Sequence, residues 1–270
     1  MLSESSKKIP IRTPWQVTKS VWWALFVREA LSRTMSDRLG WFWLFAQPII
    51  IVVVMVSIRT VVLGRIRTIS GAEFVPWLIV GLLGFQLFRE TLMRSMGAID
   101  TNKQLFSYRQ VKPIDPVFIR CYIEGLLATF ILIIFILVSL LLGFSLVPSD
   151  SLVALFSWFS LWFLGVGCGL VLSVSARLLP ETKKVIPVLI MPLFLVSGVI
   201  FPLNFLPQEY MQYFLLNPLV HGLELTRSFF FEHYQPLKGV SFFYLWLWSL
   251  SLMTIGLILH LRFEQRLKVL

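Results

Sequence analysis

Six long apolar runs dominate the 270-residue sequence and limit what it can fold into. The runs cover residues 41–63, 74–88 with a continuation to about residue 96, 117–144, 151–176, 185–203 and 240–261. A helix needs about 20 apolar residues to cross the hydrocarbon core of a bilayer, and most of these runs approach or exceed that length. Only 14% of the residues are charged and 57% are hydrophobic, which excludes an ordinary soluble domain. The sequence therefore predicts an all-α membrane protein with six transmembrane helices.

Lysine and arginine are distributed unevenly between the segments that join these runs. Most lie in the N-terminal tail (1–40), in the loops 97–116 and 177–184, and in the C-terminal tail (263–270). The loop at 145–150 has none. Basic residues collect on cytoplasmic loops, so both termini and the loop 97–116 are expected in the cytoplasm. The membrane domain then spans residues 41–262.

The segment 15–37 precedes the first apolar run and has helical character of its own. Trp15, Trp22, Phe26 and Ala30 fall near one helical face, with basic residues interspersed. A basic, tryptophan-bearing helix of this kind is typical of a helix that lies in the membrane interface. An ordinary cytoplasmic helix is the alternative.

The fifth apolar run is interrupted. Pro187, Pro192, Ser197-Gly198 and Pro202 break its helical pattern, and the backbone groups that prolines free must be satisfied by protein or water. The stretch 204–236 that follows is too polar to span a bilayer. We expect it to form short periplasmic helices on the outer face.

No motif predicts enzymatic chemistry. The sequence never contains Gly-Lys, so a phosphate-binding loop is absent, and the three histidines and two cysteines show no metal-ligand spacing. The glycines of GVGCG (165–169) lie inside an apolar run, where small residues favour close helix contact over nucleotide binding. We therefore expect no catalytic residue, metal or cofactor in this chain.

Charged residues in the second and third runs are candidates for function. Arg89, Glu90 and Arg94 are close in sequence, and Arg120 and Glu124 are one helical turn apart. A charge within a membrane helix is costly and often marks a substrate path. Two interpretations remain open: pairing that serves structure alone, or the lining of a wet substrate entrance.

Aromatic residues are abundant. Trp41 and Trp43 begin the first run, as expected for the interfacial belt, whereas Trp158 and Trp162 lie deeper and one turn apart in the fourth. Aromatic rings stack on the apolar faces of sugars, so these residues are candidates for a glycan path. Packing or lipid contact is the alternative for each of them.

Three motifs resemble the permeases of polysaccharide-export ABC transporters, in particular their capsule-exporting branch. These are SRTMSDRLGWFWLFAQP (32–48), NKQLFSYRQVKPID (102–115) and SGVIFPLNFLP (197–207). The resemblance implies a homodimer of six-span permeases that works with a separate nucleotide-binding ATPase, which holds ATP and Mg. Such an exporter moves lipid-linked capsular polysaccharide across the inner membrane of a Gram-negative cell. A periplasmic co-polymerase and an outer-membrane pore continue the path.

The resemblance also gives roles to particular residues. A short coupling helix in the cytoplasmic loop of such permeases docks into a cleft of the ATPase, and residues 97–108 occupy that place. The implied contacts are apolar at Leu105, Phe106 and Tyr108, and polar at Asp100, Asn102, Lys103 and Gln104. A solvated linker is the alternative. A conduit between two copies would take its wall from Trp41, Trp43, Arg89, Glu90, Arg94, Trp158 and Trp162.

Other functions were weighed against capsule export. An O-antigen or teichoic-acid permease would share the same architecture. A self-contained secondary transporter would need inverted repeats and an ionisable pair at mid-membrane. A membrane glycosyltransferase would need acidic catalytic residues on a loop, and Asp100, Asp115 and Asp150 are isolated from one another.

Overall fold

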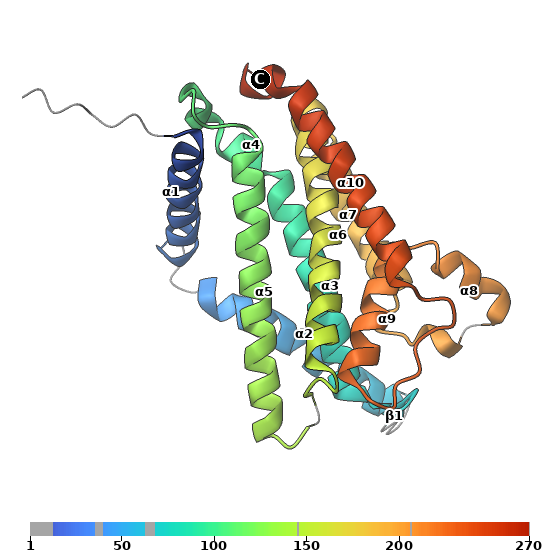
Figure 1. Cartoon of the computed structure of the whole chain (residues 1–270). Coiled ribbons are helices and arrows are strands. Elements are labelled where there is room, and N and C mark those ends of the chain that lie inside the picture. Colours follow the sequence, from blue (N-terminus) through green and yellow to red (C-terminus); the bar gives the residue numbers. More distant parts are fainter. Residues whose placement is uncertain (1–12, 36–39, 63–67, 145, 206, 270) are drawn as a thin grey trace, which may run out of the picture.

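The computed structural model describes residues 13–269 except 36–39, 63–67, 145 and 206. The described helices are α1 (Pro14–Met35), α2 (Gly40–Val62), α3 (Phe74–Met96), α4 (Ala98–Thr101), η1 (Lys103–Ser107), α5 (Asp115–Leu141), α6 (Ser151–Leu178), α7 (Thr182–Val196), η2 (Leu203–Phe205), α8 (Gln208–Phe214), α9 (Pro218–Phe230), α10 (Phe242–Arg262) and α11 (Glu264–Val269). Two short strands, β1 (Thr68–Ile69) and β2 (Ala72–Glu73), pair in an antiparallel hairpin. The prediction of an all-α membrane protein is confirmed (Figure 1).

Four helices in the described part of the chain are long and apolar enough to cross a bilayer: α3, α5, α6 and α10. Helices α2 and α7 take the places of the other two predicted spans. The clearly apolar part of α2 among the described residues is Pro48–Ile58. Helix α7 has 15 residues and contains Pro187 and Pro192. The number of six spans therefore stays a prediction.

Helix α6 lies at the centre of the bundle and packs against α3, α9 and α10. Its close contacts depend on small residues. A Cβ on Gly169 would lie 2.1 Å from the Ser95 hydroxyl of α3, and one on Gly167 would lie 3.0 Å from the Ser249 carbonyl of α10. The prediction that the glycines at 165–169 serve helix contact is confirmed.

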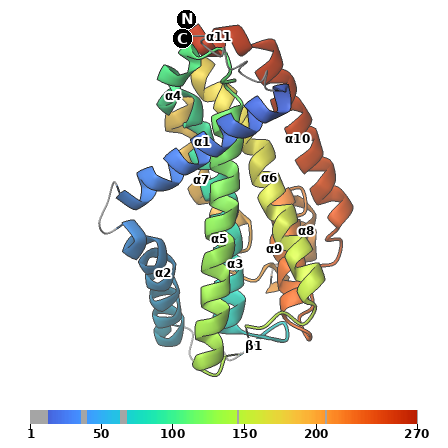
Figure 2. The same cartoon turned by 60° about the vertical axis from the view of Figure 1, so that its left-hand side comes forward.

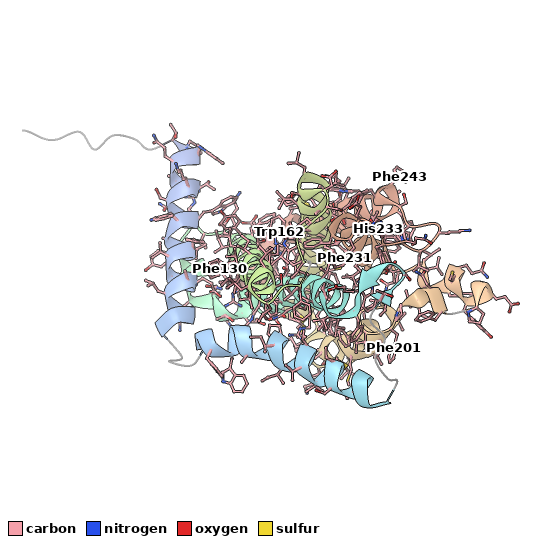
Figure 3. The ribbon with its side chains drawn as sticks, turned by 90° about the horizontal axis from the view of Figure 1, so that it is seen from below. Phe130, Trp162, Phe201, Phe231, His233 and Phe243 are labelled. Atoms are coloured by element: carbon pink, nitrogen blue, oxygen red, sulfur yellow. The ribbon has the colours of Figure 1, made fainter. Side chains whose placement is uncertain are left out.

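The outer surface of the bundle is apolar, as a lipid-facing surface must be. Figure 3 shows Phe201 and Phe243 toward the outside and Phe231 within the packed interior. Phe243 is 77% exposed, whereas Phe231 is 7% exposed. Large apolar side chains on the outside and polar contacts within are consistent with a bilayer as solvent.

Helix α1 crosses α5 on the outside of the bundle, at the end that also carries α4 and α11 (Figure 2). The indole of Trp22 donates a hydrogen bond to Asp115 Oδ1 at 2.8 Å, and Arg120 of α5 pairs with Glu29 at 3.0 Å. A helix before the first span was predicted and is present. Its position in the interface stays a prediction.

The predicted break in the fifth segment is confirmed. Helix α7 ends at Val196, and Gly198 follows with a φ of +68°, where a Cβ would also come within 2.8 Å of Leu203. Along the bundle, α7 occupies the half near α4 and α9 the half near β1 (Figure 1). Short helices form in the range 204–236, as expected. Helix α8 is exposed, but α9 is buried among α3, α6 and α10, and its Glu224 and Arg227 form an ion pair there.

Candidate functional site

The loop 97–116 joins α3 to α5 and forms a compact cap at one end of the bundle. Helices α4 and η1 lie within it, and Pro116 at the start of α5 fixes the return of the chain. Its apolar side chains pack on α5, α6 and α11, where Val111 and Leu267 are both buried. The loop is therefore folded against the bundle, and its role as a contact for the ATPase stays a prediction.

The predicted contact residues of this loop divide into two groups. Lys103, Gln104 and Tyr108 point outward, and Tyr108 is 66% exposed. Leu105 is half-buried. Phe106 is only 7% exposed, because it belongs to an apolar cluster that joins the loop to α5 and α6.

Asn102 and Asp100 bond within the chain. Asn102 is buried, donates to the Ala98 carbonyl at 2.7 Å and accepts a hydrogen bond from Arg28 of α1. Asp100 accepts from Arg177 at the end of α6, at 2.5 Å, and from Lys183 in the first turn of α7.

Burial alone would raise the pKa of Asp100. The hydrogen bonds from Lys183 and Arg177, together with their positive charges, outweigh burial and lower that pKa below its usual value. The carboxylate therefore stays ionised at neutral pH. The loop is tied in this way to α1, α6 and α7.

A second candidate site lies between α3 and α7. Arg89 pairs with Glu90 at 2.6 Å, and Arg94 lies 3.4 Å from Glu90 and 3.8 Å from Glu124 of α5. Arg89, Glu90 and Arg94 also line a cleft of about 460 Å³, closed on its other side by α7. These residues therefore form ion pairs and also line a cleft, and the role of the cleft as a substrate entrance stays a prediction.

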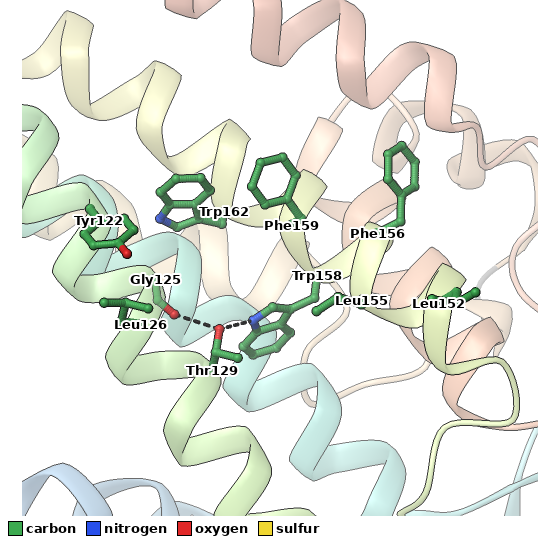
Figure 4. Close-up of a pocket in the computed structure, with 10 residues that line it drawn as sticks. All are labelled: Tyr122, Gly125, Leu126, Thr129, Leu152, Leu155, Phe156, Trp158, Phe159 and Trp162. Atoms are coloured by element: carbon green, nitrogen blue, oxygen red, sulfur yellow. Dashed lines mark hydrogen bonds between the residues drawn. The ribbon is translucent and has the colours of Figure 1, made fainter.

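The predicted aromatic residues lie elsewhere. Trp158 and Trp162 line a groove of about 460 Å³ between α5 and α6 (Figure 4). The Trp158 indole donates to the Thr129 hydroxyl at 3.0 Å. Trp43 on α2 is 57% exposed, and the side chain of Trp41 lies outside the described residues. The structure thus brings the charged residues together at one site and two of the tryptophans together at another.

The sequence analysis did not identify a buried polar cluster that centres on Arg227. Arg227 on α9 is fully buried and pairs with Glu224 at 3.1 Å. Its guanidinium donates to the carbonyls of Gly198 at 2.8 Å and Val199 at 3.0 Å, and lies over the Trp77 ring. The spacing of Glu224 and Arg227, three residues apart on one helix, was the available signal.

The same cluster reaches the segment after α9. Glu224 accepts hydrogen bonds from the Tyr234 hydroxyl at 2.9 Å and from the Leu237 amide at 3.2 Å. One carboxylate and one guanidinium therefore hold together α3, the break after α7, α9 and the segment before α10. Breaking either side of a buried ion pair is strongly destabilising, so these residues position the broken segment.

Comparison with known proteins places these features in a family. The profile of the ABC-2 type transporter family matches residues 20–231. The chain is 35% identical to the polysialic acid transport protein KpsM of Escherichia coli, over 92% of this chain and 95% of that protein. It is 30% identical to the capsule polysaccharide export inner-membrane protein CtrC of Neisseria meningitidis serogroup A, over 92% of this chain and 93% of that protein. It is 25% identical to the capsule polysaccharide export inner-membrane protein BexB of Haemophilus influenzae, over 90% of each chain. The chain belongs to the ABC-2 type transporter family.

Proposed function

We propose that this chain is the membrane permease subunit of an ATP-driven exporter that carries lipid-linked capsular polysaccharide across the bacterial inner membrane. The observation that carries the proposal is similarity along nearly the whole chain to KpsM, CtrC and BexB. Each of those proteins is named for polysialic acid transport or for capsule polysaccharide export. The apolar helices α3, α5, α6 and α10 agree with a multi-pass inner-membrane protein.

Energy is expected to come from a separate ATPase subunit. Because the sequence contains no Gly-Lys, it has no phosphate-binding loop, and ATP and Mg belong on the partner. The exposed side chains of Lys103, Gln104 and Tyr108 give the loop 97–116 a polar and aromatic surface for that partner. The ties of Asp100 to Arg177 and Lys183 would pass a displacement of this loop to α6 and α7.

The orientation and further partners are also part of the proposal. The basic residues of the loop 97–116 and of α11 favour the cytoplasmic side for this end of the bundle. A polymer of many sugars does not fit within one such bundle, so we expect a conduit between two copies. A periplasmic co-polymerase and an outer-membrane pore would receive the chain.

Deletion of the gene in its native host, followed by complementation, tests the function. The deletion strain should lose surface capsule and accumulate polysaccharide inside the cell. O-antigen should remain normal, and its loss in place of capsule would favour an O-antigen permease. Purified chain alone should hydrolyse no ATP, and activity in a contaminant-free preparation would exclude a role as a separate permease subunit.

A further inference from the structure

An apolar groove of about 600 Å³ lies where α1 crosses the bundle. Its walls come from α1, α5, α6 and α10 and are largely aromatic, with Trp22, Trp23, Tyr122 and Trp162 among them. Among the described residues that line this groove, Lys19 carries the only charge. Apart from Lys19, a surface of this kind offers water few polar partners.

One face of α1 covers the groove. Lys19, Trp22, Trp23 and Phe26 follow the i, i+3, i+4, i+7 spacing, so they lie together on that face. Helix α1 is fixed in this position, because the Trp22 indole bonds to Asp115 and Glu29 pairs with Arg120. The groove is therefore held open by specific contacts.

A second groove continues the first along α5 and α6. Tyr122 and Trp162 line both, so the two grooves adjoin at these residues, and the second runs between α5 and α6 (Figure 4). The indole nitrogens on its wall are already bonded: that of Trp162 to the Cys121 carbonyl at 2.8 Å, and that of Trp158 to Thr129. The wall thus offers apolar surface to a long, flexible hydrocarbon.

The charge of Lys19 indicates which class of lipid headgroup fits this groove. The nearby Asp115 carboxylate accepts from Trp22 and from the Lys112 amide, so it is already bonded. The ammonium of Lys19 complements a phosphate at the level of the headgroups, where a basic residue attracts anionic lipid. We propose that the groove binds an anionic phospholipid of the leaflet in which α1 lies, with an acyl chain along α5 and α6 and the phosphate against Lys19. Such a site does not depend on which glycan the protein exports.

Native mass spectrometry of the detergent-purified full-length protein tests this site. Phosphatidylglycerol and phosphatidylcholine with identical long acyl chains are titrated separately against the wild type, Lys19→Gln and Lys184→Gln. Lys184 is an exposed lysine outside the groove, so its variant removes the same charge from another place. We expect the wild type to retain phosphatidylglycerol more strongly, and Lys19→Gln to weaken the tightest binding event about fivefold, the loss that corresponds to one basic contact. Lys184→Gln should leave it unchanged.

The acyl chain is tested separately by filling the groove. Leu126 lines the α5–α6 part, and Leu126→Trp should reduce retention of the lipid. Phe130 is exposed one turn further along α5 and is not among the residues that line either groove, so Phe130→Trp should not. Thermal unfolding of each variant confirms that it is folded.

Three outcomes would overturn the proposal. Equal effects of Lys19→Gln and Lys184→Gln would mean that lipid is held only by overall charge. Equal retention of phosphatidylcholine would show that no anionic headgroup is recognised. Displacement of phospholipid by the lipid end of the exported glycan, with the same dependence on Lys19, would assign the groove to substrate.

Discussion

The guanidinium of Arg227 lies over the ring of Trp77, 3.7 Å from the ring centroid, although both side chains are fully buried. This contact joins α9 to α3 at the level where the fifth segment is broken. Two carbonyls of the break, those of Gly198 and Val199, would have no helical partner there and accept from the same guanidinium. The buried guanidinium thus supplies the hydrogen-bond donors that a continuous helix would have supplied to these two carbonyls.

Arg227→Ala should destabilise the protein strongly, because it leaves Glu224 buried without its ion-pair partner and leaves the two carbonyls unsatisfied. Removing one partner of a buried pair costs about 3–5 kcal/mol. Thermal unfolding in detergent and membrane abundance should both fall. Lys238→Ala removes an exposed charge from the segment after α9 and should change neither. A stable Arg227→Ala protein would show that the cluster does not hold the broken segment.

Gly81→Ala should be similarly damaging. A Cβ at Gly81 would lie 2.0 Å from Nη2 of Arg227, and a shift of the guanidinium would break the hydrogen bonds that Nη1 and Nη2 donate to Gly198 and Val199. Gly97→Ala is the matched control, since the nearest atom to its Cβ is 3.8 Å away. Unfolding temperature separates the two variants. Equal unfolding temperatures would mean that Arg227 can adopt another position without loss of stability.

The sequence predicts the helices better than it predicts their contacts. Apolar runs place α3 and α6 within a few residues of their observed ends, because membrane-spanning length is a local property. Proline and glycine likewise predict the break after α7 from local chemistry. The Arg227 cluster and the burial of α9 depend on neighbours from α3 and from the break itself, which no local pattern identifies.

The loop 97–116 illustrates the same limit. The sequence does not show which of its residues are exposed, and the partners of Asp100 lie 77 and 83 residues away. The resemblance implied that Phe106 is a contact for the ATPase, and only the packing against α5 and α6 shows that it is buried. Pairing of the charges on α3 was one of the two interpretations that the sequence left open, and Glu90 and Arg94 do pair, because residues four apart meet on one helical face.

Phe106→Ala should therefore lower the stability of the protein, whereas Tyr108→Ala should weaken its binding to the ATPase. Phe106 is part of the core of the loop, and truncation of a buried phenylalanine costs about 3–5 kcal/mol, so abundance and stability should fall. Tyr108 is exposed, and its loss should spare stability while reducing both co-purification with the ATPase and export. Unchanged ATPase capture by Tyr108→Ala would remove this residue from the proposed contact.

Topology can be checked with single cysteines in a background that lacks Cys121 and Cys168. Ser107 and Glu232 are both exposed, and they lie in the loop 97–116 and after α9, respectively. From the distribution of basic residues, an impermeant thiol reagent should label Glu232→Cys and not Ser107→Cys in intact spheroplasts. Both should react after permeabilisation, which serves as the control. The reverse pattern would invert the proposed orientation.

Arg89→Ala tests whether the cleft between α3 and α7 admits substrate. Both Nε and Nη2 of Arg89 donate to one oxygen of Glu90, while Arg94 approaches the other, so Glu90 keeps a partner when Arg89 is removed. Protein stability should therefore change little. A charge-assisted contact to an anionic glycan is worth about 1.5–3 kcal/mol, so its loss should reduce surface capsule by at least about tenfold at equal protein level.

Arg89→Lys keeps the charge at this position and should retain most of the export, which separates attraction of substrate from bidentate pairing with Glu90. Surface capsule, membrane abundance and unfolding temperature are measured together for both variants. A parallel fall of all three in Arg89→Ala would assign the residue to structure alone. Normal capsule at normal abundance would instead exclude Arg89 from the substrate path, even though it lines the cleft.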